Sequence, residues 1–260
     1  MSKLLALLTL AGAAMAAPIV YVTNFSDPAG FGTVNLGTGV YTTIGSTDVG
    51  EITNGPGGGV FGFRENGDWV SVNRSNGATT LIGPSGIAVD EPTRLADGTV
   101  YATDLSHNLY TVNTATGATT LVGSTGFTNP AGGLYFVILL GGETDTLYAI
   151  AASVNAGDFS PIDHARLFRL NRLTGSATFV ADVGNDAITC GLLLSGTEYI
   201  FDAFGGISSL DLATGALAPL FDLSASVGGF HGVAAAPEPA GIVLSGLGLL
   251  ALGLTRLRQR

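Results

Sequence analysis

Residues 109–122 read Leu-Tyr-Thr-Val-Asn-Thr-Ala-Thr-Gly-Ala-Thr-Thr-Leu-Val, and this stretch decides the fold. Its first four residues alternate between apolar and polar side chains, the pattern of a half-buried strand. Asn113 and Gly117 enclose a turn, because an Asn side chain bonds to its own backbone and Gly adopts a positive φ without steric cost. The β-branched residues that follow favour a returning strand. The stretch therefore predicts a β-hairpin.

The same Asn/Asp-x-x-x-Gly turn recurs along the chain. The five copies occupy residues 35–39, 73–77, 113–117, 171–175 and 211–215. Their first residues are separated by 38, 40, 58 and 40 positions. In four copies an apolar residue four or five positions after the Gly is followed by Gly or Ala, whereas the fifth copy has Pro219-Leu220-Phe221. A period of about 40 residues is typical of stacked blades.

Two further strands precede each hairpin, as residues 86–89 and 100–103 illustrate in the third copy. Four antiparallel strands per repeat predict an all-β fold, a five-bladed β-propeller over residues 17–236. The first repeat begins with its second strand, at residues 20–22, and has no first strand before it. Residues 229–234 have the small, apolar character of that missing strand. We expect the C-terminal strand to close the ring. The alternative is a six-bladed propeller with a degenerate blade in the 58-residue spacing, whereas an open β-solenoid has a much shorter period.

Composition agrees with this class. Charged residues make up 12% of the 260 residues, Gly accounts for 39 and Cys for one. Low charge with many apolar residues excludes intrinsic disorder, aperiodic Gly excludes collagen, and a single Cys excludes a disulfide scaffold. Residues 17–236 contain no Lys, six Arg and nineteen acidic residues, a formal charge of −13. We therefore expect no nucleic-acid partner.

The two ends of the chain read as targeting segments. Lys3, an apolar run over residues 4–14 and Ala14-Met15-Ala16 predict a signal peptide over residues 1–16. A short membrane anchor is the alternative, although the run is shorter than the roughly 20 residues that span a bilayer. At the other end, residues 240–255 form an apolar run that predicts a transmembrane helix.

The C-terminal segment, residues 237–260, has three parts in order: Pro237-Glu238-Pro239, the apolar run, and a basic end with Arg256, Arg258 and Arg260. It resembles a PEP-CTERM sorting signal, found on exported proteins of Gram-negative bacteria. The resemblance implies recognition and removal by an exosortase-type membrane protease, and a link to exopolysaccharide and biofilm. It also implies transient anchoring in the inner membrane, then release to the outer surface or outside the cell. A plain C-terminal membrane anchor is the alternative.

No catalytic constellation is visible. Cys190 lies among apolar strand residues, and metal-ligand spacings, a phosphate loop after residues 57–59 and a Gly-x-Ser-x-Gly elbow are all missing. We expect no cofactor and no bound metal. His107 is expected in an exposed turn, and His231 as a structural residue near the axis.

One polar cluster interrupts the repeat. The long spacing contains an insertion over residues 151–165, expected between the second and third strands of the fourth blade, with Asp158, Asp163 and His164. These side chains are the candidate cation- or sugar-binding loop, and a solvated loop is the alternative.

These features predict an exported, non-enzymatic propeller with a binding or structural role, whose partners are polysaccharide or matrix components. A secreted carbohydrate-active enzyme is the first alternative, with carboxylates such as Asp104 and Asp202 converging on the axis. A scaffold that binds a protein through the insertion is the second.

Overall fold

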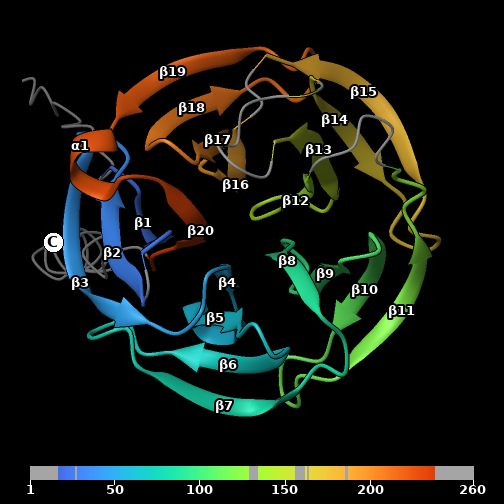
Figure 1. Cartoon of the computed structure of the whole chain (residues 1–260), viewed down its shortest axis with the longest axis horizontal. Helices are drawn as coiled ribbons and strands as arrows, with labels where there is room; N and C mark the ends of the chain where they lie inside the picture. The colour runs from blue at the N-terminus through green and yellow to red at the C-terminus, as the bar shows by residue number, and fades with distance from the viewer. Residues whose placement is uncertain are drawn as a thin grey trace, which may run out of the picture.

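The structure is a computed structural model that describes residues 17–26, 28–128, 134–155, 162, 164–184 and 187–237. These residues form a ring of five four-stranded antiparallel sheets around a central axis (Figure 1). The predicted five-bladed β-propeller is confirmed. The six-bladed alternative is wrong, because the 58-residue spacing holds the strands of one ordinary blade with longer connections.

In every blade the strands follow one another from the axis outward. The first blade contains β20 (Phe230–Ala235), β1 (Ile19–Asn24), β2 (Ala29–Asn35) and β3 (Val40–Thr47). The second contains β4 (Ile52–Asn54), β5 (Val60–Phe63), β6 (Asp68–Val72) and β7 (Thr79–Pro84). The third contains β8 (Val89–Arg94), β9 (Val100–Asp104), β10 (Asn108–Val112) and β11 (Thr119–Ser124). The fourth contains β12 (Leu134–Leu140), β13 (Tyr148–Val154), β14 (Ala165–Leu170) and β15 (Ala177–Val183). The fifth contains β16 (Ile188–Leu194), β17 (Thr197–Asp202), β18 (Gly206–Leu210) and β19 (Leu217–Asp222). A short helix, α1 (Ser224–Val227), leads from β19 to β20.

The ring closes as predicted, by pairing of the last strand with the first. β20 lies antiparallel to β1, with Val22 opposite Val233 and Val20 opposite Ala235. Phe230 and Ala234 are fully buried. The first blade is therefore assembled from both ends of the described chain, and the inner edge of β1 is paired with β20.

The repeated turn has the same hydrogen bonds in each blade. In the third blade, Oδ1 of Asn113 accepts the amide of Ala115 at 3.0 Å, and the amide of Gly117 donates to the Asn113 carbonyl at 2.8 Å. Gly117 has a φ of 79°, where a β-carbon is unfavourable. The hairpin prediction is confirmed, and the physical reason for the Asn and the Gly is the expected one.

A β-bulge interrupts the pairing of the third and fourth strands in all five blades. In the third blade, Leu109 pairs with Gly123 and Tyr110 with Leu121, which leaves Val122 as the extra residue. Val122 packs against the core, whereas Leu121 is exposed. The bulge increases the twist of the outer strand, and the outer strands run around the perimeter of the ring (Figure 1).

The hydrophobic core consists of five clusters, each between two neighbouring blades. Between the second and third blades, the fully buried Trp69 packs on Phe61 and Phe63, and its indole N–H donates to the Thr114 carbonyl at 3.3 Å. Because each blade is buried by its two neighbours, the apolar side chains of the sequence lie between sheets and not in one central core.

Two boundary predictions differ from the structure. Residues 86–88 do not begin the inner strand, since Gly86 has a φ of 80° in a loop and β8 starts at Val89. The insertion links β13 and β14 as predicted, but Ala151–Val154 extend β13 and are buried, so the connection covers only residues 155–164.

The five inner strands begin at one end of the propeller axis and end at the other. We call the first the upper mouth and the second the lower mouth. Ala17 and Pro237 both line the lower mouth, so the described chain enters and leaves the ring there. The predicted signal peptide and the predicted helix at 240–255 lie outside the described residues. No helix within the described residues has the length and apolar character needed to span a bilayer.

Candidate functional site at the upper mouth

A pocket of about 120 Å³ lies at the upper mouth, where the inner strands begin. It is lined by side chains from the inner strands and from the connections above them: Phe25, Glu51, Glu91, Phe136, Val137, Ile138, Thr189 and His231. We call it the upper pocket. A ring of five inner strands places residues far apart in the sequence around one axis, which is where β-propellers can build a site.

His231 on β20 is the central polar group of the upper pocket. Its Nε2 lies 2.9 Å from Oε1 of Glu51, and the Phe25 ring stacks on its imidazole with the ring centroids 4.5 Å apart. A β-carbon at Gly50 would clash with the imidazole, so a residue with a side chain at position 50 would displace His231. Aromatic, imidazole and carboxylate groups therefore form one contiguous cluster, in which Phe25 stacks on His231 and Glu51 contacts its Nε2.

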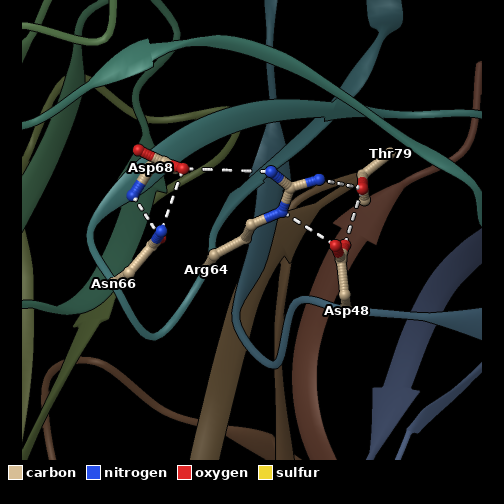
Figure 2. Close-up of polar contacts among 5 residues, drawn as sticks. All are labelled: Asp48, Arg64, Asn66, Asp68 and Thr79. Atoms are coloured by element: carbon tan, nitrogen blue, oxygen red, sulfur yellow. Dashed lines mark hydrogen bonds and ion pairs between the residues drawn. The ribbon is translucent and has the colours of Figure 1, made fainter.

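The connection that carries Glu51 is held in place by Arg64, as Figure 2 shows. The Arg64 guanidinium donates to Oδ2 of Asp48 at 2.8 Å and to the hydroxyl of Thr79 at 2.8 Å, and that hydroxyl donates to Oδ1 of Asp48 at 2.6 Å. Asp68, which accepts a bond from Asn66, lies 3.9 Å from the same guanidinium. Arg64 is thus a positioning residue for the segment before Glu51.

The rest of the upper pocket is lined by β8, β12 and β16. Glu91 on β8 is only 7% exposed, and Thr189 on β16 donates its hydroxyl to the Phe230 carbonyl at 2.7 Å. Cys190 follows Thr189 and is fully buried. Burial, reinforced by the charge of Glu91, raises the pKa of the Cys190 thiol well above its usual value, so this Cys stays protonated and is not a nucleophile.

The carboxylates proposed from the sequence do not reach the axis. Asp104 ends β9 and Asp202 ends β17, and both β9 and β17 are second strands. Asp104 accepts bonds from the amides of Ser106 and Asn108 and from the Tyr110 hydroxyl. Burial opposes ionisation of Asp104, but these hydrogen bonds outweigh it and lower its pKa. Asp202 accepts the amides of Phe204 and Gly206 in the same way. Both residues cap turns, and Glu51 and Glu91 are the acids that line the upper pocket.

His107 also differs from the prediction. It is half-buried with a φ of 60°, its ring packs edge-on against Tyr135 at 5.1 Å, and burial lowers its pKa despite the nearby Asp104. No local pattern in the sequence indicates this contact, because Tyr135 belongs to the next blade.

The candidate loop is only partly described. His164 is exposed and immediately precedes β14, whereas Asp158 and Asp163 lie outside the described residues. Glu238, Pro239, Arg256, Arg258 and Arg260 also lie outside them, and Pro237 lines the lower mouth. Within the part of the chain that the structure describes, no group of three or more His, Cys, Asp or Glu side chains could hold a metal ion.

Comparison with known proteins identifies no family. No family model and no curated protein matches the chain. A protein of unknown function from Bacteroides thetaiotaomicron VPI-5482 is similar, with a TM-score of 0.49 and 13% identity over 70% of this chain and 53% of that one. The chain thus spans about half the length of that protein. A protein of unknown function from Bacteroides caccae has a TM-score of 0.49 and 12% identity over 85% of this chain and 100% of that one. A gluconolactonase from Xanthomonas campestris has a TM-score of 0.46 and 10% identity over 83% of this chain and 79% of that one.

Proposed function

We propose that the protein is an exported, non-enzymatic β-propeller that binds a neutral saccharide of the surface matrix at its upper pocket. The observation that carries the proposal is the cluster of Phe25, His231 and Glu51 in the upper pocket, in which Phe25 stacks on His231 and Glu51 contacts its Nε2. An exposed aromatic face packs against the C–H face of a sugar ring, and carboxylate oxygens accept hydrogen bonds from sugar hydroxyls. Phe25 is 46% exposed, so part of its ring is accessible.

The charge of the propeller favours a neutral ligand over an acidic one at this mouth. Residues 17–236 carry a formal charge of −13, and Glu51 and Glu91 both line the upper pocket. Long-range repulsion and two local carboxylates disfavour a polyanion. A pocket of about 120 Å³ holds one sugar edge or a chain end.

The exported location and the sorting step rest on the resemblance of residues 237–260 to a PEP-CTERM signal. In this proposal an exosortase-type protease removes the segment after transient anchoring in the inner membrane. Expression of the full chain and of a Glu238→Ala variant in a Gram-negative host with such a system tests this. Loss of processing in the variant supports the proposal, and processing at the wild-type rate contradicts it.

Saccharide binding is tested with a glycan array followed by calorimetry on residues 17–236. Phe25→Ala and Glu51→Gln should each weaken binding by about tenfold, the equivalent of one charged hydrogen bond or aromatic contact. Phe204→Ala is the matched control, since Phe204 is 56% exposed and lies outside the upper pocket. If the Phe204→Ala and Phe25→Ala variants behave alike, the upper pocket is not the binding site.

A carbohydrate-active enzyme is the second candidate function, and the presence of two acids, Glu51 and Glu91, in one pocket favours it. Paired carboxylates at the axis are the groups that glycoside hydrolysis requires. Incubation of each bound saccharide with the wild-type protein and with Glu91→Gln, followed by a reducing-end assay, decides between the two. Turnover that Glu91→Gln abolishes would establish the enzyme, whereas binding without product supports the non-enzymatic proposal.

A further inference from the structure

The larger of the two cavities described along the axis is at the lower mouth and is separate from the upper pocket. It has a volume of about 420 Å³, a size that accepts a small organic ligand. The ends of the inner strands build it, and lateral hydrogen bonds fix them. The amide of Gly142 donates to the Arg94 carbonyl at 2.6 Å, and the amide of Leu193 donates to the Gly141 carbonyl at 2.8 Å. The Asn54 side chain donates to the Ala235 carbonyl and accepts its amide, both at 2.8 Å.

Arg94 is the cation of this lower cavity. Its Nε is buried and makes no hydrogen bond to the described residues. Its backbone is held by pairing with Val100 and by the bond from Gly142. Arg64 and Arg172, by contrast, pair with Asp48 and Asp97. A guanidinium presents planar donors that match a carboxylate, and no hydrogen bond from Nε to the described residues holds that of Arg94 in place.

The rest of the cavity lining is mostly apolar. Leu192 and Leu194 from β16 and Ile19 from β1 line it together with small residues near both ends of the described chain. The other charged group is Glu143, whose carboxylate accepts the Ser195 amide at 2.5 Å. A single cation beside an apolar wall matches a ligand with one carboxylate and an apolar body. Glu143 and the overall charge of −13 disfavour a ligand with several negative charges.

We propose that the lower cavity binds a small monocarboxylic acid, with its carboxylate on the Arg94 guanidinium and its apolar body on Leu192 and Leu194. This site is independent of the proposed saccharide site, because the two are lined by different residues at opposite mouths. It follows that a saccharide should not compete with the acid.

Isothermal titration of the whole purified chain with hexanoate, hexanamide and acetate tests the proposal. Hexanoate should bind at least about tenfold more tightly than hexanamide, which lacks the charge, and than acetate, which lacks the apolar body. Equal binding of hexanoate and hexanamide would overturn the role of Arg94, and equal binding of acetate would overturn the apolar wall. Failure of hexanoate to bind at millimolar concentration would overturn the site.

Variants test the same assignment from the protein side. Arg94→Gln should lose at least about tenfold in hexanoate affinity, and Arg94→Lys should recover part of it as a point charge. Arg169→Gln is the matched control, because it makes the same change in net charge and Arg169 does not line the lower cavity. Equal losses in Arg94→Gln and Arg169→Gln would contradict a direct contact. If Arg94→Gln does not fold, the comparison of the three ligands on the wild-type chain still decides.

Discussion

The repeat glycine Gly117 lies directly against the backbone of Gly83 in the outer strand of the preceding blade. A β-carbon at Gly117 would clash with the Gly83 carbonyl oxygen and lie 2.8 Å from Cβ of Trp69. The same arrangement recurs between Gly175 and Gly123, where a β-carbon on Gly175 would lie 2.6 Å from the Gly123 carbonyl oxygen. At the closure, Gly39 instead packs on the ring of Phe221. The glycine of each of these hairpins therefore shapes its own turn and also seats it on the neighbouring blade.

We expect Gly117→Ala to destabilise the ring by more than its positive φ alone explains. A positive φ costs an L-residue about 1–2 kcal/mol, and the clash with Gly83 should add about 2 kcal/mol. Urea denaturation measures the difference in free energy of unfolding. Gly86→Ala is the control, since Gly86 has a φ of +80° and a β-carbon there would meet no atom within 4 Å. Equal losses in the two variants would refute the blade contact.

Arg64→Ala should loosen the segment that carries Glu51 while changing global stability little. Arg64 is partly exposed, and such ion pairs contribute about 1 kcal/mol or less. Amide hydrogen exchange should become faster at residues 48–51, because the Arg64–Asp48 contact is lost. Arg74→Ala, at the second-blade hairpin, should leave exchange at these residues unchanged. Unaltered exchange in Arg64→Ala would show that the connection does not depend on Arg64.

Glu198→Gln should stabilise the propeller at neutral pH and have little effect in acid. Glu198 is 3% exposed, its Oε1 has no hydrogen-bond partner in the described residues, and burial raises its pKa well above the usual value. The unfolded carboxyl ionises above about pH 4.3, whereas the folded one keeps its proton, so the wild-type stability falls as the pH rises beyond that value. The substitution removes this dependence.

Denaturation of the wild-type and Glu198→Gln proteins at pH 4 and pH 7 measures the effect. A gain on the order of 1 kcal/mol or more at pH 7, absent at pH 4, is expected. A gain of equal size at both pH values would mean that the pKa of Glu198 does not differ between the folded and the unfolded protein. Asp222→Asn is the control, and it should change the stability at pH 7 in the opposite direction. Hydrogen bonds from Ser224 lower the pKa of Asp222 in the folded protein.

Deletion of residues 230–237 should prevent stable folding. The deletion removes β20, with the fully buried Phe230 and the nearly buried Val233, and exposes the inner edge of β1. Burial of one such side chain contributes about 1.5–3 kcal/mol, and a domain is stable by only about 5–15 kcal/mol. Near-ultraviolet circular dichroism should show loss of tertiary packing. A synthetic peptide of residues 229–237 should restore it, and a native spectrum without the peptide would contradict a closing role.

The sequence predicted the hairpins well because their signal is local. Asn113 and Gly117 specify the turn through bonds within five residues, and the period of the turns then gives the blade count. The inner strands were harder. β8 reads Val-Asp-Glu-Pro-Thr-Arg and lacks strand alternation, because it is the innermost strand of its blade and its Glu91 and Arg94 line the pockets at the two mouths. The apolar loop residues before it therefore resembled the strand more closely than the strand itself.

The candidate site was not predictable for a related reason. Glu51, Glu91 and His231 come from different blades and meet only when the ring is closed. Asp104 and Asp202 were equally suited on sequence grounds, since both end strands. What separates the two pairs of acids is distance from the axis, which depends on strand order within a blade and not on the residues beside each acid. Arg94 was missed for the same reason.

The closing strand also determines how the ring responds to force. Ile19 and Ala236 are hydrogen-bonded neighbours at the lower mouth, where the amide of Ala236 donates to the Ile19 carbonyl at 2.9 Å. Tension between Ala17 and Pro237 would pull β1 and β20 apart from one end, so that their backbone pairs break one after another, as in a zipper. Tension on Pro237 alone, against a ring held elsewhere, runs along β20 and loads all the pairs in shear at once. A propeller tethered through one end is thus mechanically stronger than the same propeller stretched between both.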